Sequence, residues 1–260
     1  MVAWSKLFRS RQLPLRFQLW RKHHRAGVPE YLARHYWWAY LTRGSVQLFD
    51  HPAIINAILF GQYRAMMDSA IGYLRDQPCG RFLQLTCVYG ELIPNLYSLL
   101  DTTAFHLTDI APVQLQAVKD KIDRCDADTP FCMARTNVEA MPYADSSFDT
   151  LQIFFLLHEL PRTARQNVLC EVLRVLKPGG RLVIVEYGEI GRTHWLHRFP
   201  PFRWTLEFFE PYLGEFWRGS LKDQLIGSAT QVGKKLELVQ EKHFFGGFYR
   251  LLDWECGEKP

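Results

Sequence analysis

From residue 81 onward, short runs rich in apolar and β-branched residues alternate with longer amphipathic segments. The runs cover residues 81–88, 104–109, 131–136, 148–157 and 181–187. The run at 148–157 is almost continuously apolar, which is typical of a parallel strand buried on both faces. The segment at 161–176 has helical periodicity and ends before Lys177-Pro178-Gly179-Gly180. This alternation predicts an α/β fold, a doubly wound sheet with helices on both faces.

The remaining segments place other elements around this sheet. Residues 236–242 and 248–254 predict a terminal antiparallel hairpin, and residues 30–41 and 52–74 have the pattern of helices. Apolar residues make up 48% of the chain, enough for one full hydrophobic core. We therefore expect three parts: a basic amphipathic segment at 1–29, an N-terminal helical cap at 30–76, and an α/β domain at 77–260 with an aromatic insert at about 190–233.

The first 29 residues hold seven Lys and Arg residues and no acid, interleaved with aromatic and aliphatic residues. Three interpretations stay open: a solvated basic tail, an anchor at an anionic membrane surface, and a mitochondrial presequence. Nucleic acid is not expected as a partner, because no recognised binding module follows. The six cysteines are scattered without a CxxC pair, which indicates a cytoplasmic type of compartment. No stretch approaches the roughly 18 apolar residues of a membrane span.

Ligands of open α/β sheets bind beyond the carboxyl ends of the strands. In this chain those positions are 88–91, 109–110, 137–139, 157–159 and 186–188. Asp109 ends the second predicted strand, where a carboxylate can accept the hydroxyls of a ribose. The alternative is that Asp109 caps the following helix.

Residues 46–189 resemble the class I methyltransferases that act on quinone head groups. Three segments carry the resemblance: Asn137-Val138-Glu139-Ala140-Met141-Pro142-Tyr143, Ser147-Phe148-Asp149, and Leu173-Arg174-Val175-Leu176-Lys177-Pro178-Gly179-Gly180-Arg181-Leu182. The resemblance implies a class I methyltransferase-like fold that binds S-adenosylmethionine (SAM).

The cofactor loop departs from that family. Such enzymes carry a loop close to D-x-x-G-G-T-G-D, whose glycines let the backbone approach the methionine part of SAM. In this chain Gln84 replaces the acid, Cys87 and Val88 replace two of the glycines, and Tyr89 replaces the small polar residue. Only the last glycine, Gly90, is kept, and Glu91 follows it. In the third loop, Asn137 stands where the family has an acidic residue. Either SAM sits differently in this chain, or the domain has decayed to a structural role.

A second group of polar residues follows the fourth predicted strand. His158 and Glu159 are adjacent there, at the sheet edge where Glu91 and Asp109 are also expected. Mixed imidazole and carboxylate ligands suit Mn²⁺ or Fe²⁺ better than structural Zn²⁺. We therefore predict a metal site formed by Glu91, His158 and Glu159.

The whole combination resembles the RquA family of rhodoquinone biosynthesis enzymes. The shared motifs are Val88-Tyr89-Gly90-Glu91, Phe154-Phe155-Leu156-Leu157-His158-Glu159, Tyr36-Trp37-Trp38-Ala39-Tyr40 and Phe244-Phe245-Gly246-Gly247-Phe248-Tyr249. The resemblance implies conversion of ubiquinone to rhodoquinone, in which SAM donates an amino group that replaces a ring methoxy group and Mn²⁺ is required. The alternatives are an ordinary SAM-dependent quinone methyltransferase and a non-catalytic binding protein.

Site roles follow from this interpretation. We expect Tyr89, Glu91 and His158 to be catalytic, with Glu91 as metal ligand or general base and Tyr89 orienting the amine. The residues expected at SAM are Gln84, Cys87, Tyr89, Gly90, Asp109, Ile110, Asn137, Val138 and Phe155.

An aromatic segment at 194–217 suggests how a lipid-soluble quinone enters. Its nine aromatic residues interleave with Arg198 and Arg203, and Arg192 and Arg218 flank it, a composition that suits a membrane-facing lid. The alternative is that this segment is a structural helix packed on the sheet. Together with the basic N-terminus, the segment predicts a cytoplasmic, peripherally membrane-associated protein, at the mitochondrial inner membrane in a eukaryote.

Overall fold

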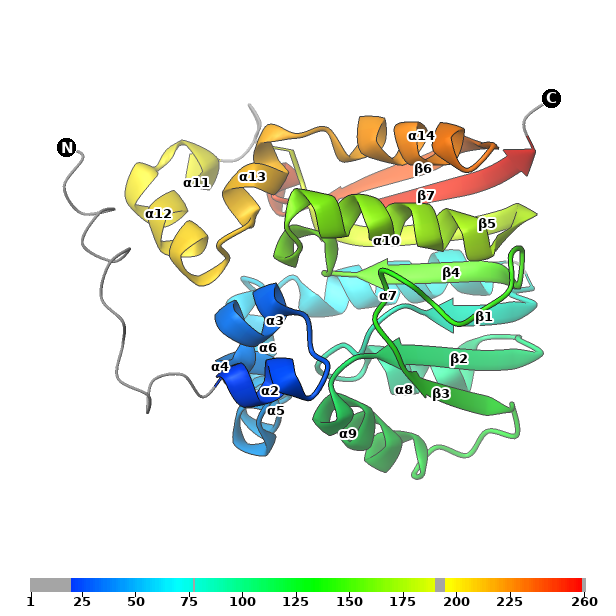
Figure 1. Cartoon of the computed structure of the whole chain (residues 1–260), viewed down its shortest axis with the longest axis horizontal. Coiled ribbons are helices and arrows are strands. Elements are labelled where there is room, and N and C mark those ends of the chain that lie inside the picture. The colour runs from blue at the N-terminus through cyan, green and yellow to red at the C-terminus, as the bar shows by residue number, and fades with distance from the viewer. Residues whose placement is uncertain (1–19, 77, 190–194, 259–260) are drawn as a thin grey trace.

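A computed structural model describes residues 20–76, 78–189 and 195–258, and these residues form a mixed sheet of seven strands (Figure 1). The strand order is β3-β2-β1-β4-β5-β7-β6. The first five strands pair in parallel, and β7 and β6 complete the sheet as an antiparallel hairpin. The strands are β1 (Arg81–Gln84), β2 (Ala104–Asp109), β3 (Phe131–Arg135), β4 (Phe148–Phe154), β5 (Leu176–Tyr187), β6 (Lys234–Phe244) and β7 (Tyr249–Glu258). The predicted doubly wound sheet with its terminal hairpin is confirmed.

Several strand boundaries differ from the prediction: the fourth strand ends at Phe154, three residues early, and both hairpin strands are longer than expected. The first strand ends at Gln84 rather than at Val88, because the chain turns into a loop whose Cys87 amide donates to the Asp109 carboxylate. The fifth strand starts at Leu176, where Leu176 pairs with Phe148 before a register shift. The Pro-Gly-Gly sequence therefore forms an irregularity inside β5 and does not separate it from the preceding helix.

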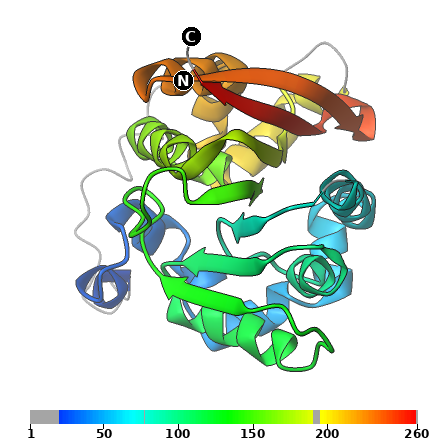
Figure 2. The same ribbon diagram turned by 90° about the vertical axis from the view of Figure 1, so that its right-hand side faces the viewer.

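Helices cover both faces of the sheet, as the end-on view of Figure 2 shows. On one face, α7 (Tyr63–Arg75) packs against α8 (Leu92–Leu99), which in turn contacts α9 (Pro112–Ile122). On the other face, α10 (Arg162–Val175) packs against α14 (Leu221–Gln231). The core between these layers is apolar and includes Phe82, Phe105, Leu151 and Leu182, all fully buried.

Shorter helices gather at the carboxyl end of the parallel strands (Figure 1). The cap comprises α2 (Trp20–Arg25), α3 (Glu30–His35), α4 (Trp37–Tyr40), α5 (Arg43–Phe49) and α6 (Pro52–Ile58). From the other side of the sheet come α11 (Trp195–Arg198), α12 (Pro200–Phe209) and α13 (Leu213–Arg218). Two single-turn helices, η2 (Leu157–Glu159) and η3 (Phe245–Gly247), follow β4 and β6. These elements surround the edge of the sheet where ligands bind in open α/β folds.

The cap is more broken than its sequence pattern predicted. The expected helix at 30–41 is interrupted at Tyr36, and the one at 52–74 at Phe60 and Gly61, both of which have positive φ. The second break lets the Phe60 ring stack on Phe245, with ring centroids 5.7 Å apart. Residues 1–19 and 190–194, which include most of the predicted basic segment and the start of the predicted insert, lie outside the described residues. Within the described part of the chain, no helix has the length and hydropathy needed to cross a bilayer.

Candidate active site

A cavity of about 650 Å³ lies between the strand ends, the cap and α12. Its walls are mostly apolar, with a few polar groups at the sheet edge. Nine of the predicted site residues line it: Cys87, Tyr89, Asp109, Ile110, Asn137, Val138, Phe155, His158 and Glu159. The predicted residues Gln84, Gly90 and Glu91 are not among its lining residues. A large apolar cavity with a few converging polar groups is the usual form of a small-molecule site.

Asp109 lines the cavity, and two backbone amides hold its carboxylate. Its Oδ2 accepts a hydrogen bond of 2.9 Å from the Cys87 amide, and its Oδ1 accepts one of 2.7 Å from the Ala111 amide at the start of α9. Burial raises the pKa of the Asp109 carboxyl to about 6, although these amide donors favour the charged form. Because each carboxylate oxygen has two lone pairs, the group can still accept hydroxyl donors from a ligand.

Tyr89 closes one wall of the cavity against the cap. Its hydroxyl donates to the Ala39 carbonyl over 2.7 Å and accepts from Gln114 Nε2 over 3.0 Å. Its ring stacks on Tyr40 and Phe49, with centroids 5.7 and 5.9 Å away. The hydroxyl proton is therefore committed to the backbone of the cap. This contact gives the large aromatic side chain of the loop a structural role.

Gly90 turns the chain away from the cavity immediately after Tyr89. Its φ is +80°, and a Cβ at this position would come within 2.5 Å of the Tyr63 hydroxyl. The Gly90 amide donates to Asp50 Oδ1, and the Gly90 carbonyl accepts from Lys121 Nζ. Glycine is needed here both for its positive φ and for the close approach of Tyr63.

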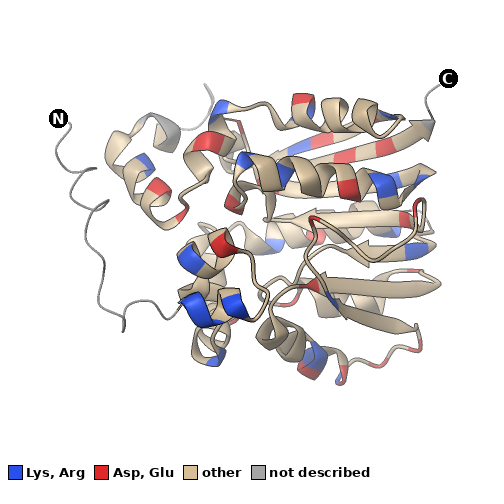
Figure 3. Ribbon diagram, in the orientation of Figure 1, with Lys and Arg blue, Asp and Glu red and all other residues tan. Residues whose placement is uncertain are grey.

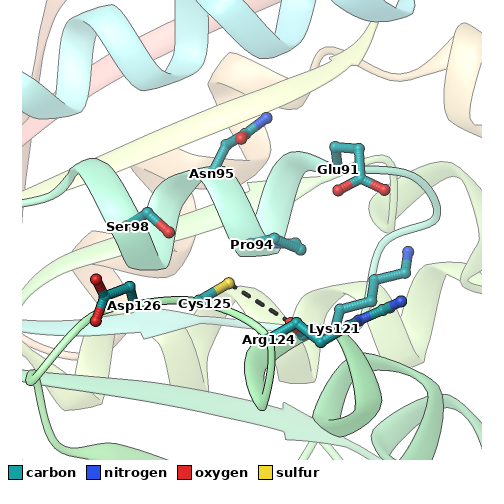
Figure 4. A pocket seen from close by; sticks show the side chains of 8 residues that line it. All are labelled: Glu91, Pro94, Asn95, Ser98, Lys121, Arg124, Cys125 and Asp126. Atoms are coloured by element: carbon teal, nitrogen blue, oxygen red, sulfur yellow. Dashed lines mark hydrogen bonds between the residues drawn. The ribbon is translucent and has the colours of Figure 1, made fainter.

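The structure corrects the predicted position of Glu91. This residue is the N-cap of α8, and its side chain lines a separate groove of about 480 Å³ between α8 and α9. Figure 4 shows it there beside Pro94, Asn95 and Lys121. The early end of β1 and the turn at Gly90 direct Tyr89 to the cavity and Glu91 to the outer face. The structure therefore does not bring Glu91 together with His158 and Glu159.

Gln84 also lies away from the cavity wall. Its side chain is fully buried in the sheet, and its Nε2 donates to the Thr86 carbonyl over 3.1 Å. Through this hydrogen bond Gln84 stabilises the start of the loop.

A compact cluster of acids and imidazole occupies the other end of the cavity. His158 and Glu159 lie on η2, and Glu210 follows the last residue of α12. One donor atom from each of the three lies within 4.8 Å of the other two. His158 Nε2 is 4.0 Å from Glu210 Oε2. Sequence reasoning missed Glu210, whose only local signal is a single carboxylate between Phe209 and Pro211.

Each member of the cluster is oriented by a further residue. Glu186, at the end of β5, places Oε1 2.8 Å from His158 Nδ1, which leaves Nε2 to face the cavity. The Tyr40 hydroxyl donates to Glu159 Oε1, and the Tyr36 hydroxyl donates to Glu210 Oε2 over 2.9 Å. Such outer partners fix the orientation of metal-binding side chains in proteins.

The electrostatics of the cluster reflect its burial. Burial raises the pKa of the Glu159 carboxyl to about 8, and the neighbouring Glu210 carboxylate adds to this effect. Burial alone would lower the pKa of His158, but the combined effect of Glu186 and the other nearby acids raises it to about 9. The cluster therefore has an excess of acidic groups over cationic ones in a place shielded from water. One imidazole and two carboxylates are a donor set that fits a divalent cation such as Mn²⁺.

Comparisons with known proteins concern the sheet and the segments that connect its strands. A family model described as a methyltransferase domain matches residues 83–184. This part of the chain is therefore similar to a methyltransferase domain. The domain is similar to the ubiquinone/menaquinone biosynthesis C-methyltransferase UbiE of Erwinia tasmaniensis, with 32% identity over 110 residues, which are 42% of this chain and 43% of that protein. It is also similar to the UbiE of Shewanella halifaxensis, with 28% identity over 52% of this chain and 54% of that protein. The chain thus spans about half the length of the curated relatives it matches.

Solved structures share the fold of this chain at low identity. The N-methyltransferase NodS of Bradyrhizobium japonicum, in complex with S-adenosyl-L-homocysteine, superposes with a TM-score of 0.52 at 15% identity, over 92% of this chain and 98% of that one. The [4+2]-cyclase SpnF superposes with a TM-score of 0.56 at 15% identity, over 85% of this chain and 98% of that one. At this identity the likeness establishes the fold alone. The two proteins are described by different reactions, so the fold does not determine which group is transferred.

Proposed function

We propose that the chain is a SAM-dependent enzyme acting on a quinone, and that it converts ubiquinone to rhodoquinone with the amino group of SAM, assisted by Mn²⁺. SAM binding is supported by the methyltransferase domain and by the position of Asp109 and Asn137 at the cavity wall. A quinone substrate is supported by the similarity to proteins of quinone biosynthesis and by the apolar wall of the cavity.

The observation that favours amino transfer is the cluster of His158, Glu159 and Glu210 in the same cavity as Asp109. A methyl group leaves a sulfonium without loss of a proton from the donor. An ammonium group must instead lose a proton before its nitrogen can attack a ring carbon, so proton acceptors are required. Glu159 and His158, whose pKa values are raised to about 8 and about 9, can accept this proton once they have lost their own. A divalent cation bound there would supply Lewis-acid activation of a quinone oxygen.

The proposed reaction balances with water as the only further reactant. A C–N bond forms at the ring carbon as its methoxy group takes up a proton and leaves as methanol. The bond between nitrogen and the donor's α-carbon must then break. The quinone ring accepts the two electrons released, and water provides the carbonyl oxygen of the departing donor. The products are an aminated quinol, methanol and the 2-oxo acid derived from SAM.

Isotopic labelling of SAM tests the proposal. The protein is incubated with ubiquinone, Mn²⁺ and SAM that carries heavy nitrogen in its amino group and deuterium in its methyl group, and the quinone products are analysed by mass spectrometry. Heavy nitrogen in the product supports amino transfer. Deuterium without heavy nitrogen refutes it and supports methyl transfer to a quinone, the second candidate, which the similarity to UbiE favours. The Asp109→Ala variant is the control, because it should lose SAM binding and both products.

We further propose that the enzyme takes its quinone from a membrane surface. On α12, Trp204 and Phe208 are 69% and 78% exposed, and Trp195 and Phe199 extend the same apolar surface. Phe209 and Trp38 both line the cavity wall, and their ring centroids are 6.1 Å apart. This pair connects the exposed aromatic surface to the cavity. Lys and Arg residues of α2 and α3 lie at the same end of the molecule (Figure 3). Exposed aromatics beside basic residues are typical of proteins that bind anionic lipid.

Vesicle flotation tests this surface. The wild-type protein should float with anionic vesicles at low salt, and the double variant Trp204→Ser/Phe208→Ser should not. Ile226→Ser is the matched control, since Ile226 is also exposed but lies on α14. Equal flotation of the double variant and the control would rule out α12 as the binding surface.

A further inference from the structure

We infer that His158, Glu159 and Glu210 bind one divalent cation, and that through Glu210 this cation fastens α12 over the cavity. The inference deepens the proposed function by assigning ligands to its Mn²⁺, and it replaces Glu91 with Glu210 in the ligand set. It also gives the cation a second role, which is to hold together parts of the protein that are distant in sequence.

The ligands come from two separate parts of the chain. His158 and Glu159 directly follow β4 in the centre of the sheet, whereas Glu210 lies between α12 and α13. The cap contributes too, because Tyr36 and Tyr40 donate hydrogen bonds to Glu210 and Glu159. A cation at this position would therefore connect the sheet, the cap and the α12–α13 segment.

Helix α12 is packed less deeply than its neighbour, although its Phe202 ring contacts Phe60 and Phe248, with ring centroids 5.6 and 6.1 Å apart. None of its residues is buried, while the next helix, α13, buries Leu213, Phe216 and Trp217. The Phe216 ring also packs under the guanidinium of Arg165, 5.0 Å away. Helix α13 is thus anchored by apolar packing, and Glu210 marks the point where the well-packed part of the segment ends. Segments with little buried apolar surface open at low free-energy cost.

A divalent cation would offset the acidic character of the cluster. Glu159, Glu186 and Glu210 surround a single imidazole, and Glu186 is already engaged with His158 Nδ1 and the Leu157 amide. Two carboxylates held this close repel each other in a site of low dielectric. A divalent cation between them turns this repulsion into attraction, so Glu210 should stay at the cluster when the cation is bound and leave it more readily when it is absent.

Direct binding of Mn²⁺ to the full chain, without SAM or quinone, tests the ligand set. Electron paramagnetic resonance and calorimetry should show binding to the wild-type protein, and Glu210→Gln should weaken the affinity at least about tenfold. Glu207→Gln is the matched control: Glu207 is on the same helix, pairs with Arg203 at 3.4 Å, and lies outside the cluster. Circular dichroism verifies that each variant is folded. Wild-type affinity in Glu210→Gln, or no binding by the wild type, would overturn the assignment.

Hydrogen exchange tests the attachment of α12. Adding Mn²⁺ should slow exchange of the amides in residues 200–209 of the wild type and of Glu207→Gln, but not of Glu210→Gln. Equal exchange with and without Mn²⁺ in a wild-type protein that binds the ion would refute the fastening of α12. Both measurements omit SAM and quinone, so their outcome is independent of the labelling experiment. Amino transfer without Mn²⁺ binding at this cluster would leave the proposed function standing and remove this inference.

Discussion

Replacing Tyr63 with phenylalanine should loosen the loop that carries Tyr89 and Gly90. The Tyr63 hydroxyl donates to the Tyr89 carbonyl over 2.9 Å and accepts from the buried Leu92 amide over 3.0 Å. The substitution removes one oxygen atom and leaves both backbone groups without this partner. Each buried group left unsatisfied costs about 1–3 kcal/mol. Because the Tyr89 carbonyl is only partly buried and its loss lies at the low end of this range, we expect the free energy of unfolding to fall by about 2–4 kcal/mol.

Thermal unfolding monitored by calorimetry measures this cost. For a chain of this size, each kcal/mol corresponds to about 2–4 °C in Tm, so the Tm of Tyr63→Phe should fall by at least about 4 °C. Tyr73→Phe is the control on the same helix, since the Tyr73 hydroxyl has no hydrogen bond to any described residue. SAM affinity should also fall in Tyr63→Phe, because the loop lies over Asp109. A Tm within about 1 °C of both the wild type and the control would refute the idea that this hydroxyl holds the loop.

Four further substitutions or conditions test other parts of the site. Burial raises the pKa of Asp109 to about 6, and ribose hydroxyls need the ionised carboxylate. SAM affinity measured by calorimetry should therefore weaken about tenfold for each pH unit below that value and be constant above pH 7. Arg165→Lys should weaken Mn²⁺ binding about tenfold, since the Arg165 guanidinium holds two carbonyls of the turn after β4; Arg162→Lys, on the same helix, should not. Gly90→Ala should lower the Tm through positive-φ strain of about 1 kcal/mol and the contact described above. Glu91→Gln should keep most of the turnover with labelled SAM, and complete loss would return Glu91 to the catalytic machinery.

The sheet and the positions of its strand ends follow from local sequence patterns. Buried parallel strands require continuous apolar runs, and the intervening helices require amphipathic periodicity, so both are visible in any short window. The same logic placed Asp109, Asn137 and His158 at one edge of the sheet, where the structure finds them lining a common cavity. The departure of residues 84–91 from a glycine-rich loop was visible as well, although the reason for Tyr89 was not.

Tertiary structure decided which of these groups meet. Glu210 lies 52 residues after His158 in the sequence, whereas Tyr36 and Tyr40, which donate hydrogen bonds to the cluster, lie more than a hundred residues before it. Such contacts depend on how short helices pack over the strand ends, and no local pattern encodes them. The exclusion of Glu91 depends likewise on one backbone angle at Gly90. The sequence alone therefore determined the sheet and the edge where ligands bind, because these depend on the burial of each segment. The make-up of the acidic cluster depends on packing between segments, and only the folded chain specifies it.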